Sequence, residues 1–290
     1  MRTIITVIFC LTFLLVSCGR RTKQSSSSTS WNYIQTTTND SLTHLEQEKQ
    51  KELYEFLIGD TLPRKTDGTF DDFIYAFASN SELQLKRIIF PLPYYDEDGV
   101  SRINEEDWVH DSLFINNNYY TLLFDTEEEM DGLDSLSSKS VQIELYLLAE
   151  RKVKTYYFVR INDVWFMEAI NLRDIEGGDK EGFFDFFAHF SADSLFQAHR
   201  IVQPLQFVTI DPDDEFSILE TELEPGQWFA FRPPVPKDYL FNINYGQNTE
   251  NLSNHKIVVF RGIGNGFFNA LFFTRIDGLW KLFKFEDTSI

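Results

Sequence analysis

Apolar positions with helical spacing fill two stretches of the chain, and the second stretch repeats the first. The first stretch runs from Phe70 to Leu92 (FDDFIYAFASNSELQLKRIIFPL), and the second from Phe183 to Leu205 (FFDFFAHFSADSLFQAHRIVQPL). Ten of the twenty-three aligned positions are identical, including three phenylalanines spaced i, i+3 and i+7. This spacing is typical of one face of an amphipathic helix. We therefore predict that one structural unit occurs twice and that a helix opens each copy.

A second, shorter helix is predicted in each copy. Asn80 and Asp193 stand where an N-cap is needed, because their side-chain oxygens can accept hydrogen bonds from the free amides at a helix start. Arg87 and Arg200 fall at the end of this helix, where the helix dipole favours a cation. A proline four residues after each arginine limits the next extended segment to a sheet edge or a bend.

A second repeated block has the pattern of a β-hairpin. Tyr156 to Glu168 (YYFVRINDVWFME) aligns with Leu271 to Phe283 (LFFTRIDGLWKLF), and the central dipeptides are Asn-Asp and Asp-Gly. Such dipeptides favour two-residue turns between antiparallel strands. Further strands are predicted at Val141 to Leu147 and at Ile257 to Arg261, which lie between the two repeated blocks of each copy.

The predicted hairpin register pairs an arginine with a tryptophan in each copy. Arg160 lies opposite Trp165, and Arg275 lies opposite Trp280, so that a cation can stack on an indole ring. Together with the two arginines at the helix ends, these residues are candidates for the floor of an anion or sugar pocket. The alternative is a structural role, in which the Arg-Trp pairs pack the sheet and the helix-end arginines form a salt bridge or a cap.

The first hairpin is apolar on both faces. The face opposite to the Arg-Trp pair carries Val159, Ile161, Val164 and Phe166. A sheet with one face in water would alternate apolar and polar residues. We therefore expect two sheets that pack against each other, or a homodimer formed through a sheet face.

Two acidic stretches lack the spacing of a metal-binding loop. Glu127 to Asp131 and Asp211 to Glu215 are therefore expected to be solvated loops. Residues 211–238, which are rich in acids and prolines and have no clear counterpart in the first copy, are predicted to form a long irregular insertion.

The order of elements resembles that of a known superfamily. Two helices followed by antiparallel strands that end in a long hairpin resemble the cone-shaped fold of nuclear transport factor two-like (NTF2-like) proteins. The repeated phrases around Phe73, Gln84 and Pro91 also resemble a family of uncharacterised lipoproteins from Gram-negative gut bacteria. The resemblance implies an α+β protein with two tandem cone-shaped domains, each with short N-terminal helices packed on a curved antiparallel sheet. We place the first domain, with a leading helix, at residues 40–174 and the second at residues 175–290.

The N-terminus has the pattern of a lipoprotein signal peptide. Arg2 precedes an apolar run from Ile4 to Val16, which as a helix of about 20 Å is too short for a bilayer core of about 30 Å. The run ends in Leu-Val-Ser-Cys-Gly, which resembles a lipobox, whose cysteine carries the lipid. We predict that residues 1–17 are removed, that Cys18 is lipidated, and that residues 18–39 form a flexible Ser/Thr-rich tether. The alternative is an ordinary signal peptide with an incidental cysteine.

This pattern places the protein in the bacterial cell envelope. The residues after Cys18 include no acidic run of the kind linked to surface export, so we expect an outer-membrane anchor that faces the periplasm. The net charge of −19 would repel a phosphate backbone, which argues against nucleic acid as a partner.

The sequence holds no catalytic, phosphate-binding or metal-binding motif, so we expect no cofactor and no metal. The histidines do not recur between the copies, and we interpret them as surface or core residues: His44, His110, His189, His199 and His255.

These observations favour a non-catalytic binding or scaffolding module for an unknown envelope protein or small molecule. Two alternatives stay open. A pocket protein for a small molecule or glycan would need a cavity lined by tryptophan and tyrosine inside one cone. An enzyme of the isomerase or dehydratase type would need an acid and a base within hydrogen-bond distance in that cavity.

Overall fold

The structure is a computed structural model that describes residues 65–133, 139–175, 181–247 and 253–290. All of these residues belong to one compact unit, Lys49–Ile290. The predicted signal peptide, the tether, the leading helix, Cys18 and His44 lie outside the described residues. No helix in the described part of the chain is long and apolar enough to cross a membrane.

The two halves of the described chain have the same order of main elements, two helices followed by six strands. The first half contains η1 (Lys65–Asp67), α3 (Phe70–Ser79), α4 (Ser81–Lys86), β1 (Leu92–Asp96), β2 (Gly99–Ile103), η2 (Glu105–Asp107), β3 (Tyr119–Phe124), α5 (Glu127–Asp131), β4 (Ser140–Leu147), β5 (Lys152–Ile161) and β6 (Val164–Asp174). The second half contains α6 (Phe183–Ala192), α7 (Ser194–His199), β7 (Ile201–Asp211), β8 (Asp214–Leu223), α8 (Trp228–Phe231), β9 (Tyr239–Asn244), β10 (His255–Gly262), β11 (Phe268–Ile276) and β12 (Leu279–Asp287). The predicted α+β class is therefore confirmed.

Both predicted helix pairs are present, with the predicted caps. The phenylalanine stripes of α3 and α6 are buried, and each such ring contributes on the order of 2 kcal/mol of burial free energy. The Asn80 side-chain oxygen accepts a hydrogen bond from the Leu83 amide at 3.0 Å. The Asp193 side chain accepts one from the Leu195 amide at 2.8 Å. These caps separate the two helices of each pair.

The predicted hairpin turns are also confirmed. Ile161 pairs with Val164 in β5 and β6, and the two turn residues between them have φ values of 48° and 65°. Ile276 pairs with Leu279 in β11 and β12 across a turn with φ values of 52° and 82°. Positive φ at both central positions is the geometry that matches the twist of paired strands.

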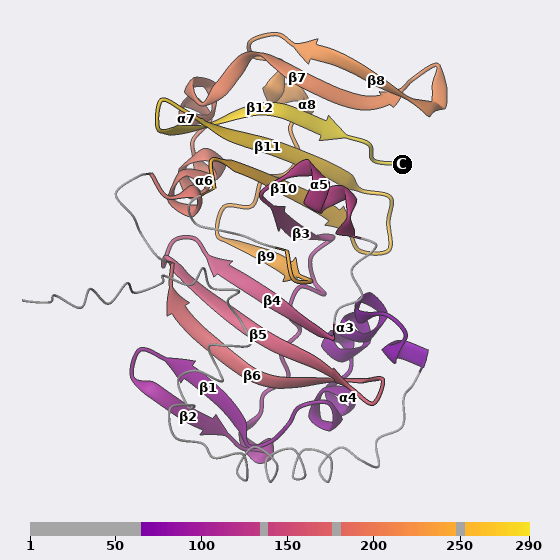
Figure 1. Ribbon diagram of the computed structural model, residues 1–290, viewed down its shortest axis with the longest axis vertical. Helices are drawn as coiled ribbons and strands as arrows, with labels where there is room; N and C mark the ends of the chain where they lie inside the picture. Colours follow the sequence, from indigo (N-terminus) through magenta and orange to yellow (C-terminus); the bar gives the residue numbers. More distant parts are fainter. Residues whose placement is uncertain (1–64, 134–138, 176–180, 248–252) are drawn as a thin grey trace, which may run out of the picture. The chain divides into compact units, whose positions relative to one another are not determined.

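All twelve described strands form a single sheet, in which the halves exchange one strand each. The order is β2-β1-β6-β5-β4-β9-β3-β10-β11-β12-β7-β8 (Figure 1). Read from the outer strands inward, β2-β1-β6-β5-β4 matches β8-β7-β12-β11-β10. The third strand of each half then crosses over, because β9 pairs with β4 and β3 pairs with β10, both antiparallel. The two exchanged strands lie next to each other and are parallel.

The exchange gives two cores on opposite faces of the central strands. Leu122 and Phe124 of β3 belong to the core that contains the α3 phenylalanines, whereas Leu123 belongs to the core that contains the α6 phenylalanines. Successive residues of a strand point to opposite faces of a sheet. Each core also takes residues from the other half, such as Phe272 in the first core and Tyr146 in the second. Neither half therefore completes its core alone.

The expectation of two sheets packed face to face is wrong, because the halves share one sheet through β3 and β9. On the second apolar face of the first hairpin, Val164 and Phe166 are nevertheless buried and pack against the partly buried Ile89, Val159 and Ile161. A homodimer formed through a sheet face stays a prediction.

The prediction of a long irregular insertion at residues 211–238 is also wrong, because β8 and α8 lie within this range. β7 and β8 form a hairpin in which Asp211 pairs with Asp214, so the second acidic stretch is a turn and a strand start. Glu127 to Asp131 forms the short helix α5, whose N-cap Thr126 accepts a hydrogen bond from the Glu129 amide at 3.2 Å. Acidic residues suit the first turn of a helix because of its dipole.

Candidate functional site

The arginines and tryptophan predicted as ligand contacts in the first half gather around one carboxylate, Asp67. Arg87 donates a hydrogen bond to the Asp67 carboxylate at 2.9 Å, and Arg160 donates one to the Asp67 carbonyl oxygen at 3.0 Å. The Trp165 backbone amide donates to the same carboxylate at 3.2 Å. The Arg160 guanidinium also lies over the Trp165 ring, 5.9 Å from its centroid. The predicted Arg-Trp register is confirmed.

The second half repeats this cluster around Glu181. Arg200 binds the Glu181 carboxylate through two hydrogen bonds of 2.9 and 2.8 Å, and the Trp280 amide donates to it at 3.0 Å. Arg275 donates to the Glu181 carbonyl oxygen at 2.7 Å and lies 4.4 Å from the Trp280 ring centroid. Burial raises the pKa of Glu181, but the hydrogen bonds from Arg200 and from the Trp280 amide outweigh it and hold the pKa below its ordinary value.

Each cluster ties the start of the first helix to the hairpin at the end of the same half. Arg87 and Asp67 are both only 1% exposed, whereas Arg200 and Glu181 are 14% and 22% exposed. Arg87 and Arg200 therefore bind carboxylates of their own chain, which is the salt-bridge role weighed as an alternative from the sequence. Arg160 and Arg275 bind backbone carbonyl oxygens and stack on tryptophan rings. Ligand binding by these residues stays a prediction, and neither cluster lines the two pockets described below.

The repeated glutamines are explained by a second duplicated contact. Gln84 donates a hydrogen bond to a carbonyl of α3 at 3.2 Å and accepts one from the Trp108 indole at 2.9 Å. Gln197 donates in the same way to a carbonyl of α6 and accepts from the Trp228 indole at 3.1 Å. Both glutamines are buried. They fasten each helix pair to a distant tryptophan.

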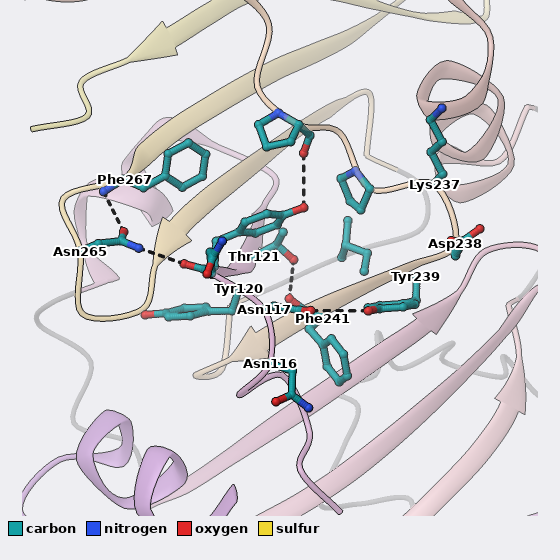
Figure 2. A pocket seen from close by; sticks show the side chains of 15 residues that line it. Asn116, Asn117, Tyr120, Thr121, Lys237, Asp238, Tyr239, Phe241, Asn265 and Phe267 are labelled. Carbon is teal, nitrogen blue, oxygen red and sulfur yellow. Dashed lines mark hydrogen bonds between the residues drawn. The ribbon is translucent and has the colours of Figure 1, made fainter. Parts of the chain in front are cut away.

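An open pocket of about 650 Å³ lies where the exchanged strands β3 and β9 begin (Figure 2). Its lining comes from residues 116–121, from residues 234 and 236–241, and from Asn265 and Phe267 in the β10–β11 turn. Because β3 and β9 are parallel, their first residues lie at the same end of the sheet. The loops that lead into these strands come from different halves, so the pocket exists only because the strands are exchanged. We call it the exchange pocket.

Reciprocal hydrogen bonds join the two loops of the exchange pocket. Tyr119, the first residue of β3, donates from its hydroxyl to the Pro234 carbonyl oxygen at 3.3 Å. Tyr239, the first residue of β9, donates to the Asn117 side-chain oxygen in a longer contact of 3.5 Å, which Figure 2 shows. Burial raises the pKa of Tyr119, and the nearby Tyr239 adds to this effect. The Tyr119 phenol therefore remains a hydrogen-bond donor at neutral pH.

Aromatic contacts fix both tyrosine rings. The Tyr119 ring packs edge-on against Phe260 at 5.5 Å and lies 5.8 Å from Phe267. The Tyr239 ring packs edge-on against Phe241 at 5.5 Å. Because Tyr239 is still 42% exposed, it presents an oriented aromatic surface to a ligand.

Asparagine amides form the polar part of the lining. Asn265 accepts a hydrogen bond from the Phe267 amide at 3.0 Å and donates one to the Asn118 carbonyl oxygen at 3.3 Å. A Cβ atom on Gly262 would lie 1.7 Å from the Asn265 side-chain oxygen, so this close approach requires glycine. Among the described residues, the side-chain amide nitrogens of Asn117 and Asn118 have no protein partner, and both face solvent at least in part.

The arrangement suits binding better than proton transfer. The four described histidines are exposed, and none lines either described pocket: His110, His189, His199 and His255. A buried carboxylate next to a tyrosine does occur, since Tyr146 donates to Glu144 at 2.9 Å. Burial and the charge of Glu144 raise the pKa of Tyr146 well above its ordinary value, which keeps its proton in place. Neither residue of this pair lines either pocket.

Comparisons with known proteins agree with the fold. The family model described as a domain of unknown function, DUF4348, matches residues 49–287. The chain is also similar to the crystal structure of an NTF2-like protein from Bacteroides fragilis NCTC 9343, with 55% sequence identity and a TM-score of 0.77. This match covers 79% of the chain and 100% of the B. fragilis chain. No curated protein matches the chain.

Proposed function

We propose a binding function for this chain, which belongs to the DUF4348 family of domains of unknown function. Its ligand occupies the exchange pocket, and the protein acts as a non-catalytic binding module. The observation that carries this proposal is the position of the pocket. Its aromatic and amide lining is held in place by contacts between the two halves, where Tyr120 of the first core and Leu240 of the second core both reach the pocket wall.

The packing of the cores argues against a site inside either half. Phe73, Phe77 and Phe158 are at most 1% exposed in the first core, and Phe186 and Phe273 are fully buried in the second. Neither described pocket is lined by a residue of α3, α4, α6 or α7. Neither of these two pockets is therefore the substrate cavity between helices and sheet that the isomerase or dehydratase alternative requires.

The lining favours a neutral, hydroxyl-rich ligand, and we propose a saccharide. A side-chain amide offers both a donor and an acceptor, which matches the two roles of a sugar hydroxyl. The exposed Tyr239 ring supplies an apolar surface on which a sugar ring can lie. Lys237 and Asp238 border the pocket with opposite charges, so the lining favours neither a cationic nor an anionic ligand. The volume falls within the range of small-molecule sites, about 300–1,000 Å³.

Isothermal titration calorimetry tests this proposal. The full chain, purified in detergent, is titrated with a panel of neutral oligosaccharides that differ in sugar type and linkage. We expect at least one to bind, and we expect Asn117→Ala and Tyr239→Ala each to weaken it by about tenfold, a loss of about 1.4 kcal/mol. Tyr75→Ala is the matched control, because Tyr75 is an exposed tyrosine on α3 outside the pocket. Binding that survives both pocket substitutions would place the ligand elsewhere.

We also propose that the chain is held in the bacterial cell envelope by a lipid on Cys18, at the outer membrane and facing the periplasm. The lipobox-like sequence that ends at Cys18 supports this proposal. Cells that express the chain are fed an alkyne-tagged fatty acid, and the membrane fraction is collected. We expect the tag on the natural chain, whereas Cys18→Ser should be untagged and no longer held in the membrane. An equally tagged variant would contradict the assignment of Cys18.

Finally, we propose that residues 40–174 and 175–290 are two tandem copies of one cone-type unit that have exchanged their third strands. The shared order of elements and the duplicated clusters around Asp67 and Glu181 support this proposal.

A further inference from the structure

β8 forms an outer strand of the sheet with an unprotected edge. Among the described strands only β7 pairs with it, so the other side of β8 presents backbone donors and acceptors to solvent (Figure 1). Proteins usually protect such edges with short strands, with charged side chains, above all lysine, or with proline. β8 has ten residues, DEFSILETEL, with neither lysine nor proline, whereas the opposite outer strand β2 has only five residues.

Apolar and acidic side chains are both exposed along β8. Ile218, Glu220 and Glu222 occupy every second position of the strand and therefore share one face of the sheet. Ile218 is 57% exposed, and Phe216, two residues before it, is 91% exposed. On the neighbouring strand β7, Val208 and Ile210 are only half-buried. An exposed strip of this kind marks an interaction surface.

A hollow of about 380 Å³ lies beside the C-terminal end of β8, which carries Glu220 and Glu222. It is lined by Glu127, Glu220 and Glu222, together with Gln206, Phe207, Val208, Thr221, Phe283 and Lys284. Lys284 pairs with Glu127 at 3.0 Å. Within the described part of the chain, the carboxylates of Glu220 and Glu222 have no ion-pair or hydrogen-bond partner. The hollow can therefore receive a cationic side chain.

We propose that the edge of β8 binds an extended, cationic peptide segment of a partner protein. The segment adds to the sheet as a further strand, its backbone pairs with β8, and its lysine or arginine side chains reach Glu220 and Glu222. A second copy of the chain is a poorer occupant. β8 carries four acidic residues and no basic one, so pairing of β8 with itself would bring like charges together.

Fluorescence anisotropy with labelled peptides of about ten residues tests this inference. The first peptide alternates lysine with valine or threonine, the second replaces each lysine by glutamate, and the third is the lysine peptide with methylated backbone nitrogens. We expect only the first peptide to bind the full chain. Methylation keeps the charge but removes backbone donors, so equal binding of the first and third peptides would show charge attraction without strand addition and would overturn the proposal.

Substitutions locate the binding edge. The double variant Glu220→Gln/Glu222→Gln should weaken binding of the lysine peptide by about tenfold. The matched control is Glu105→Gln/Glu106→Gln, which removes two adjacent exposed glutamates of η2 and should leave binding unchanged. Unchanged binding in the β8 variant would contradict the proposal. The proposal would also be contradicted if the natural chain formed a dimer and Ile218→Lys dissociated it. A second copy of the chain would then occupy the edge.

Discussion

Thr121 on β3 pairs with Asn242 on β9, and this contact joins the two strands that the halves of the chain exchange. The Thr121 hydroxyl donates to the Phe241 carbonyl oxygen at 2.7 Å. The buried Asn242 side chain donates to Glu144 of β4 at 2.8 Å. The loops that lead into the same two strands line the exchange pocket. Strand exchange and the candidate binding site are therefore one feature of the fold.

The exchange predicts that the halves depend on each other. Residues 40–174 and 175–290, expressed as separate chains, should each lack a cooperative unfolding transition, because each core takes side chains from the other half. Mixing the two chains should restore the transition, followed by circular dichroism during heating. A half that unfolds cooperatively by itself would show that the exchange is dispensable.

The duplicated clusters differ in burial and should therefore contribute different amounts to the unfolding free energy. Arg87→Ala leaves the Asp67 carboxylate buried without its arginine, and loss of one partner of a buried pair costs about 3–5 kcal/mol of unfolding free energy. Arg200→Ala should cost less, because Glu181 is partly exposed and water can solvate it. Urea denaturation measures both values. Equal losses in the two variants would contradict the assigned role of burial.

The lowered pKa of Glu181 predicts a pH dependence of stability. Its pKa is below the ordinary value of 4.5 in the folded chain, so the ionised form stabilises the fold. This contribution is present above the ordinary value and is lost as the pH falls through the lowered one. The difference in unfolding free energy between the natural chain and Glu181→Gln should be constant near neutral pH and should shrink in acid. Urea denaturation of both chains at a series of pH values measures this difference. A difference that stays constant from neutral to acidic pH would contradict the prediction.

The close approach at Gly262 predicts a coupled pair of substitutions. Gly262→Ala should displace the Asn265 side chain and break the hydrogen bond that it accepts from the Phe267 amide. Loss of this hydrogen bond should lower the unfolding free energy by about 1 kcal/mol. Adding Asn265→Ala removes the clashing oxygen, so the double variant should be less destabilised than the sum of the single ones. Thermal unfolding of the three variants measures the coupling. Additive losses would show that the two residues do not interact.

Local patterns predicted the elements of the fold but not how the halves join. The phenylalanine stripe of α3 and the Asn162-Asp163 turn each carry their structural information within a few residues, so the two helix pairs and the two repeated hairpins were predicted correctly. The exchange could not be predicted, because β3 has the same pattern whichever half supplies its neighbours. β8 was missed because almost all of its residues are exposed on both faces and give no alternation.

The candidate site was predicted least well, for physical reasons. Asp67 and Glu181 are different residue types that precede the repeat by three and two positions, so an alignment at one offset does not pair them. The exchange pocket is built from loops without periodicity, and its residues meet only after the strands cross. A run of three asparagines before β3, Asn116 to Asn118, is a local feature that could have indicated it, but no site was predicted there from the sequence.

Nuclear magnetic resonance of the full chain with ¹⁵N-labelled asparagine tests most directly whether a ligand occupies the exchange pocket. The side-chain amides of Asn117 and Asn118 are followed during titration with the tightest-binding saccharide, with the buried Asn171 of β6 as internal control. We predict that the two pocket amides shift in proportion to occupancy and that Asn171 does not. Saturation of binding without a shift of Asn117 or Asn118 would contradict the assignment of the pocket as the binding site.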